Sequence, residues 1–187
     1  LPSWSQPSLV DLRACLDAHL ARFGNPSTDV HRARAEVLAA CRSAATLPPG
    51  LFSLTVPTGG GKTLSSLAFA LDHAIRHNLD RVVYVLPFTS IIEQNAAVFR
   101  EVFAPLGPDV VIEHHSNLDP DSAPFSPAAR LATENWDARI IVTTIQKLAT
   151  FIAGNRTHEV YDGHIVIIFD ECHRSQFGEM HTAITRA

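Results

Sequence analysis

A chain of 187 residues, of which 46% are hydrophobic, can bury one substantial core but hardly two, so we predict a single domain. Charged residues make up 18% of the chain and the net charge is -4, which excludes a protein that coats nucleic acid through an overall basic surface. Any contact with nucleic acid must therefore be local.

The cysteines and the charge pattern near the start indicate an intracellular protein. Cys15, Cys41 and Cys172 are too few for a disulfide framework and lack the spacing of metal ligands, which favours reduced thiols in a cytoplasmic setting. Charged residues such as Asp11 and Arg13 interrupt the longest apolar stretch near the start, so neither a signal peptide nor a membrane span is expected. We expect a soluble, cytoplasmic protein.

Two helices are predicted before residue 48. Ser8 can cap the first, because apolar residues recur at helical spacing after it until Gly24-Asn25-Pro26. Thr28 or Asp29 can cap the second, which ends at Leu47-Pro48-Pro49-Gly50. The apolar face predicted for this second helix consists of Val30, Ala33, Val37 and Ala40. Its arginines, Arg32, Arg34 and Arg42, are interpreted as ordinary solvated surface.

From residue 51 onward, apolar strands alternate with helices. The predicted strands are Leu51–Val56, Arg81–Leu86, Asp109–Glu113, Arg139–Thr143 and His164–Phe169. The predicted helices are Lys62–His77, Ser90–Phe103, Pro127–Asn135 and Ile145–Ala153. Repeated βα units form a parallel sheet flanked by helices. We therefore predict an α/β domain over residues 49–187, preceded by a helical extension over residues 1–48.

A glycine-rich loop, Pro57-Thr58-Gly59-Gly60-Gly61-Lys62-Thr63, lies between a predicted strand and a predicted helix. Glycines allow backbone N–H groups to approach phosphate oxygens, and a helix N-terminus favours an anion. Lys62 can reach the terminal phosphates and the Thr63 hydroxyl can bind Mg²⁺, so the pattern indicates an ATP site. The full motif has a glycine where this chain has Val56, so the match is to a relaxed form. A generic glycine turn is the alternative.

A second group of polar residues, Asp170-Glu171-Cys172-His173, follows the very apolar run Ile165–Phe169. Ligands of α/β sheets bind at the carboxyl ends of strands, where this group is expected. Asp170 can hold Mg²⁺, and Glu171 can orient or deprotonate the water that attacks the γ-phosphate. His173 is a candidate for coupling rather than a base. We expect these residues to complete the site begun by the glycine-rich loop.

The two motifs together resemble the first RecA-like domain of superfamily 2 DExH helicases and translocases. Up to about residue 143 the chain resembles the CRISPR-associated helicase of type I interference systems, in Phe52–Pro57, Pro87–Asn95, Glu113–Asn117 and Glu134–Asp137. From about residue 141 it resembles the motor subunit of type I restriction enzymes, in Val142–Leu148 and Phe169–Glu179. A hybrid, natural or constructed, with its junction near Thr143 and Thr144, explains this change of likeness.

The resemblance implies that the chain acts on DNA. It places Thr89, Ser90 and Gln94 in one segment that touches the nucleic-acid backbone, and Thr143 and Thr144 in the next. Hydroxyl groups and helix N-termini can bind phosphates without a strongly basic surface, which agrees with the negative net charge. The alternative for Thr89 and Ser90 is a simple helix cap.

The leading prediction is an ATP-dependent DNA helicase or translocase domain from a prokaryotic defence complex. In the family, a second RecA-like domain supplies arginines to the ATP site, and a further strand commonly lies between the loop strand and the acidic strand. We find neither in this sequence, so we expect weak nucleotide binding and slow hydrolysis. The alternative is a nucleotide-binding switch or scaffold. His114 and His115 lack partner ligands at suitable spacing, so no metal is assigned to them.

Overall fold

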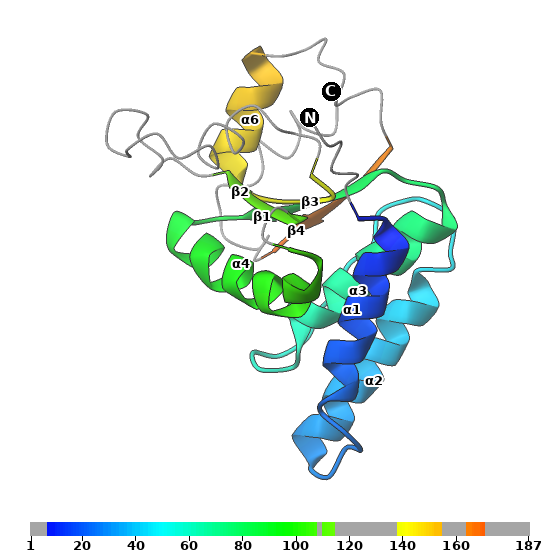
Figure 1. Cartoon of the computed structure of the whole chain (residues 1–187). Coiled ribbons are helices and arrows are strands. Elements are labelled where there is room, and N and C mark those ends of the chain that lie inside the picture. The colour runs from blue at the N-terminus through cyan, green and yellow to red at the C-terminus, as the bar shows by residue number, and fades with distance from the viewer. Residues whose placement is uncertain (1–6, 108–109, 115–137, 155–163, 171–187) are drawn as a thin grey trace.

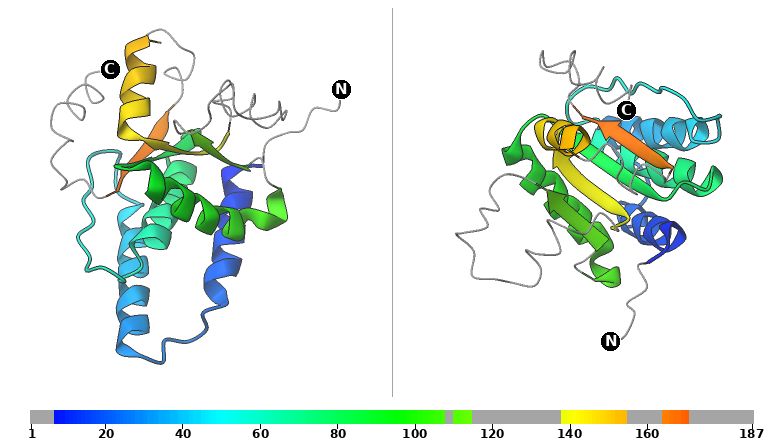
Figure 2. Two further views of the ribbon diagram at one scale, coloured as in Figure 1. Left: turned by 90° about the vertical axis from the view of Figure 1, so that its left-hand side faces the viewer. Right: turned by 90° about the horizontal axis from the view of Figure 1, so that it is seen from above.

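The computed structural model describes residues 7–107, 110–114, 138–154 and 164–170. Its centre is a sheet of four parallel strands in the order β2-β3-β1-β4. The strands are β1 (Arg81–Leu86), β2 (Val111–His114), β3 (Ile140–Thr144) and β4 (Ile165–Phe169). Helices cover both faces of this sheet (Figures 1 and 2). The predicted α/β class is therefore confirmed, and these four strands agree with the predicted ones to within two residues.

Strand β1 lies in the interior of the sheet, because β3 pairs with one of its edges and β4 with the other. Tyr84, for example, lies between Val142 of β3 and Ile168 of β4. Five of the six residues of β1 are buried. This burial explains why the strand is apolar along its whole length, as parallel strands covered on both faces are.

Alternate residues of β1 face two different helical layers. Tyr84 and its neighbours two residues away belong to the main core, with α3 (Lys62–Arg76) and α4 (Thr89–Phe103). Val83 and Val85 face the other side and pack with Ile145 and Leu148 of α6 (Ile145–Gly154). Because successive side chains of a strand point to opposite faces, one short sequence serves both layers.

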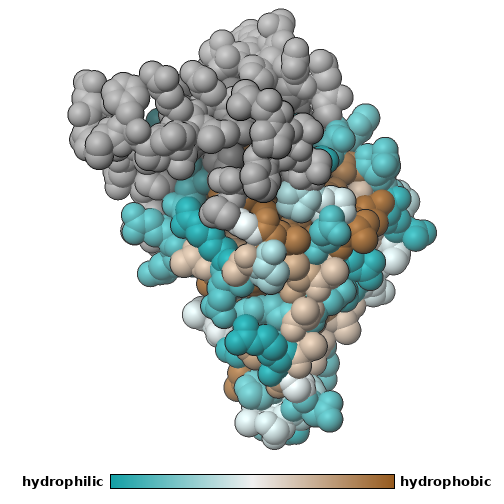
Figure 3. All heavy atoms as spheres, in the orientation of Figure 1, coloured by the Kyte–Doolittle hydropathy of each residue, from teal (hydrophilic) through white to brown (hydrophobic). Residues whose placement is uncertain are grey.

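Two N-terminal helices pack on α3 and extend away from the sheet (Figure 2). In α1 (Leu9–Ala21), the Ser8 hydroxyl accepts a hydrogen bond from the Asp11 amide, and the Asp11 carboxylate accepts one from the Ser8 amide. Thr28 caps α2 (Asp29–Ala44) by accepting from the His31 amide. Both predicted caps are therefore confirmed. On the face that Figure 3 shows, most residues at this end of the molecule are hydrophilic or weakly apolar.

The predicted apolar face of α2 is wrong. Val30 is 55% exposed, whereas Cys41 is buried and Leu38 packs against the core. Leu38, Cys41 and Ala45 recur at helical spacing and form the side that packs inward. Beside this side, Arg42 forms ion pairs with Asp17 of α1 and Asp72 of α3, which make an ionic network between the three helices. Helical spacing alone fits more than one face of a helix rich in alanine.

Asp72 is the centre of this ionic network. Its carboxylate lies 2.9 Å from Nε of Arg13 and 3.4 Å from Nη1 of Arg42. Burial raises the pKa of Asp72 above its ordinary value, and the two guanidinium groups oppose that rise. The network therefore joins α1, α2 and α3 through one partly buried carboxylate. None of the helices in the described ranges is both long and apolar enough to cross a membrane.

The predicted strand Leu51–Val56 is absent, and its residues form an irregular segment with Leu51 92% exposed. Phe52 packs on α3 instead, with its ring centroid 4.9 Å from that of Phe69 and 5.5 Å from that of His73. Both edges of β1, the strand that follows α3, are already paired. An apolar run becomes a strand only when it pairs with a neighbouring strand. This segment packs an aromatic side chain against α3 instead.

Removing a buried side chain from α1 tests whether the helix pair belongs to the core. Leu12 has no exposed surface, whereas Val10 on the same helix is 60% exposed. We expect Leu12→Ala to lower the free energy of unfolding by about 2–5 kcal/mol, because it leaves a cavity. Val10→Ala should change it by less than about 0.5 kcal/mol. Urea denaturation followed by circular dichroism measures both, and equal effects would contradict the packing of α1.

Candidate functional site

The glycine-rich loop leads directly into α3. Gly59 and Gly61 adopt positive φ angles of 82° and 80°, a conformation that favours glycine. Gly61 is the N-cap of α3 and supplies no side-chain hydrogen bond to the first turn. The N-terminus of this helix of 15 residues therefore meets a turn built from glycine backbone. Such a terminus favours an anion, because its N–H groups and the helix dipole both carry partial positive charge.

Gly60 is required for a different reason. A Cβ atom at this position would lie 2.2 Å from Cγ1 of Val56 and 3.0 Å from the carbonyl oxygen of Pro57. The Gly60 amide also donates a hydrogen bond of 3.0 Å to that oxygen. Val56, the one departure from the full motif, thus occupies the space beside Gly60. Val56 and Pro57 therefore pack directly against the backbone of Gly60.

Lys62 and Thr63 occupy the first turn of α3, and both are half-buried. The carbonyl oxygen of Thr63 accepts a hydrogen bond of 3.1 Å from the Ser66 hydroxyl. That hydroxyl lies 3.0 Å from the hydroxyl of Tyr84 on β1. A chain of two hydrogen bonds therefore connects the beginning of α3 to the interior strand of the sheet.

The structure places Asp170 at the carboxyl end of β4, where its amide donates a hydrogen bond of 3.0 Å to the carbonyl oxygen of Val85. Burial raises the pKa of Tyr84, and the charge of Asp170 raises it further, while the hydrogen bond with Ser66 opposes the shift. Tyr84 thus stays a neutral phenol. It forms a hydrogen bond with Ser66, and the negative charge of Asp170 raises its pKa. The same strand therefore links both predicted halves of the site. Glu171 and His173 lie outside the described residues.

The predicted nucleic-acid residues lie at the carboxyl ends of two neighbouring strands, β1 and β3. Thr89 and Ser90 begin α4 just after β1, and Gln94 is exposed on the same helix. Thr143 is fully buried, and the Thr144 hydroxyl accepts a hydrogen bond of 3.2 Å from the Lys147 amide at the start of α6. Thr144 therefore has a capping role. Contact between these residues and nucleic acid stays a prediction.

One residue that contacts the loop was not predicted from the sequence. Arg34 of α2 donates a hydrogen bond of 2.8 Å from Nε to the carbonyl oxygen of Gly59, 25 residues further along the chain. Arg34 is exposed, as its interpretation as solvated surface predicted, but that interpretation missed this contact with the loop. The same correction applies to Arg42, which lies in the ionic network, whereas Arg32 pairs with Asp29 within its own exposed turn. No local pattern in the sequence distinguishes these three arginines.

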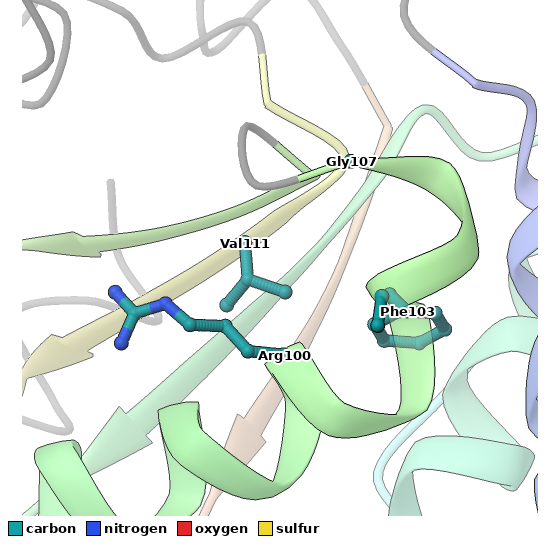
Figure 4. Close-up of a pocket in the computed structure, with 5 residues that line it drawn as sticks. Arg100, Phe103, Gly107 and Val111 are labelled. Carbon is teal, nitrogen blue, oxygen red and sulfur yellow. The ribbon is translucent and has the colours of Figure 1, made fainter.

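A pocket of about 290 Å³ lies on another part of the described structure (Figure 4). It is formed by α4, β2 and the short helix η1 (Ala104–Leu106) that follows α4. Its lining residues include Phe103 and Val111. Arg100, which also lines it, forms an ion pair with Glu113. The pocket does not include any residue of the glycine-rich loop.

A family model described as "Type III restriction enzyme, res subunit" matches residues 31–187, which is most of the chain. The chain belongs to this family. Its parallel sheet with helices on both faces is the RecA-like arrangement that we predicted. The match spans Thr143 and Thr144, where we predicted a change of likeness, and the glycine-rich loop lies inside it.

Curated relatives of this res-subunit family member are restriction enzyme subunits. The endonuclease subunit of a type I restriction enzyme from Staphylococcus aureus (strain COL) is 30% identical over 132 residues, which are 68% of this chain and 12% of the relative. A sequence from Mycoplasma pneumoniae, described as the C-terminal part of such a subunit, is 31% identical over 131 residues, which are 66% of this chain and 56% of that sequence. The chain thus spans about an eighth of the staphylococcal relative.

From the contact between Val56 and Gly60 we predict how substitutions at these positions change the affinity for nucleotide. Gly60→Ala should weaken the binding of Mg²⁺·ATP about tenfold, because the new methyl group forces the loop open. Val56→Ala removes Cγ1, so the double variant should recover most of the lost affinity. Titration with a fluorescent ATP analogue measures each dissociation constant.

Gly50→Ala is the matched control, because the nearest atom to its new Cβ is a carbonyl oxygen at 3.9 Å. It should bind nucleotide like the unaltered protein. A double variant that binds no better than Gly60→Ala would show that Val56 does not shape the loop.

Proposed function

We propose that this chain is the ATP-binding motor domain of a restriction enzyme, and that it couples ATP hydrolysis to movement along DNA. One observation carries the proposal. The N-terminus of α3, preceded by two glycines with positive φ, is connected through Ser66 and Tyr84 to the strand beside Asp170. Membership of the res-subunit family and the restriction enzyme relatives support the same conclusion.

The residues present fit ATP and Mg²⁺. The backbone from Thr58 to Gly61 offers a glycine turn at a helix N-terminus that no side chain caps, which suits a polyphosphate. Lys62 would neutralise charge on the terminal phosphates. The Thr63 hydroxyl and the Asp170 carboxylate are hard oxygen ligands of the kind that Mg²⁺ prefers, and the metal would stabilise charge that develops during phosphoryl transfer. Glu171 would orient or deprotonate the attacking water, with His173 coupling the site to DNA.

DNA is the proposed track. Thr89, Ser90 and Gln94 would contact its backbone from the start of α4, and Thr143 and Thr144 would do so from the end of β3. Because Thr143 is buried and Thr144 caps α6, such contact requires this strand end to open. A second RecA-like domain and the other subunits of a restriction complex are the proposed partners. The likeness of the earlier residues to the CRISPR-associated helicase, and a hybrid origin, remain predictions.

A nucleotide-binding switch that does not move along DNA is the second candidate. The position of Leu51–Val56 outside the sheet favours it, because the loop then lacks a direct strand connection to the sheet. A motor transmits the state of its nucleotide to the DNA-binding edge. A loop held mainly by helices could instead transmit that state to a partner protein.

Hydrolysis of ATP in the presence of DNA distinguishes the two candidates. We expect single-stranded DNA to raise the rate of Mg²⁺-dependent hydrolysis at least several-fold. Lys62→Ala should abolish hydrolysis by removing the charge at the terminal phosphates, and Glu171→Gln should abolish it while leaving nucleotide binding intact. Phosphate release and nucleotide binding are measured on each protein.

Lys147→Ala serves as a charge-matched control, because it removes a lysine from α6 rather than from the glycine-rich loop. It should hydrolyse ATP like the unaltered protein. Binding of ATP together with a rate that DNA does not change would reject the motor and leave the switch. Failure to bind Mg²⁺·ATP at all would reject both.

A further inference from the structure

Arg34 touches both left-handed turns of the glycine-rich loop. Its Nε atom donates a hydrogen bond of 2.8 Å to the carbonyl oxygen of Gly59. Its aliphatic stem lies against Gly61, since a Cβ atom on that glycine would be 3.3 Å from Cγ of Arg34. Gly59 and Gly61 have the positive φ angles that give the loop its shape. One side chain thus holds the two positions at which the backbone changes direction.

The contact does not follow from general packing of α2. Residues 29–36 of this helix are all exposed, and its buried side, at Cys41 and Ala45, lies at the other end. Arg34 therefore reaches the loop from a part of the helix that is outside the core. Its aliphatic stem and planar head suit this contact, because the stem can pack while the guanidinium donates.

Arg34 also differs from the other arginines of α2 in the kind of partner that its guanidinium group has. Arg32 pairs with Asp29, and Arg42 pairs with Asp17 and Asp72. Within the described ranges, no carboxylate lies within ion-pair distance of Arg34, which donates to a backbone carbonyl instead. A guanidinium group carries five N–H donors, and this hydrogen bond uses one of them. A positive charge consequently stays beside the loop, close to where the proposed function places phosphates.

We propose that Arg34 is a positioning residue for the glycine-rich loop. By holding the Gly59 carbonyl and covering Gly61, it keeps the loop in the shape that accepts a nucleoside triphosphate. It thereby makes the exposed half of α2 part of the nucleotide site. This inference rests on the proposed function for its ligand, but the restraint on the loop can be measured without any nucleotide.

Two variants of Arg34 test the restraint. Arg34→Met keeps most of the stem and removes every donor, so exchange of the amides of residues 58–63 with deuterated water should become several-fold faster without nucleotide. The dissociation constant for Mg²⁺·ATP should rise about tenfold, as expected when a charged hydrogen bond is lost. Arg34→Lys can still donate to the Gly59 carbonyl and should restore part of both properties. The urea midpoint should not change.

Arg32→Met is the matched control, since it removes an arginine two residues away on the same exposed stretch. It should change neither amide exchange nor affinity. Arg34→Met with the exchange of the unaltered protein would overturn the proposal. A urea midpoint that falls together with affinity would also overturn it, because Arg34 would then be a general scaffold residue. If the unaltered chain binds no Mg²⁺·ATP, the proposed function fails, while amide exchange still decides whether Arg34 holds the loop.

Discussion

The packing of α3 between the sheet and the α1–α2 pair is the constraint on which the candidate site depends. Seven of its residues are buried: Ser65, Leu67, Ala68, Ala70, Leu71, His73 and Ala74. The alanines have short side chains, so that neighbouring elements can approach closely. Because the glycine-rich loop leads directly into this helix, a fixed α3 also fixes the place of the helix N-terminus. The position that suits an anion is thus set by packing along the body of the same helix.

Polar contacts fasten the same helix at its other end. His73 and His77 lie 3.0 Å and 2.8 Å from the carbonyl oxygens of Ala45 and Leu47, and Arg76 donates to that of Thr46. A carbonyl oxygen only accepts hydrogen bonds, so the facing nitrogen of each histidine carries the proton. These contacts satisfy carbonyl groups of the turn that follows α2. The segment from residue 45 to the loop is therefore held at its start by α3 and near its end by α2.

Most elements could be predicted from the sequence, because their patterns are local. A continuous apolar run places β1, helical spacing places α3, and Ser8 identifies the start of α1. The strand Leu51–Val56 could not be judged in this way, since strand formation depends on a neighbour elsewhere in the chain. The chemistry at Lys62 and Asp170 stays a prediction from the motifs. The contacts through Ser66, Tyr84 and Arg34 depend on tertiary packing, so no spacing indicates them.

The contacts that hold the glycine-rich loop bear on where the boundary between the predicted domain and its N-terminal extension lies. Residues 1–48 were predicted to be an extension of a nucleotide-binding domain that starts at residue 49. In the structure, however, α2 packs on α3, and Arg34 meets the loop. The family match begins at residue 31, so it includes Arg34 but leaves out α1. With Leu51–Val56 outside the sheet, the loop depends on α2 and α3 for its position. We therefore propose that α2 belongs to the unit that carries the glycine-rich loop, and that α1 braces this unit.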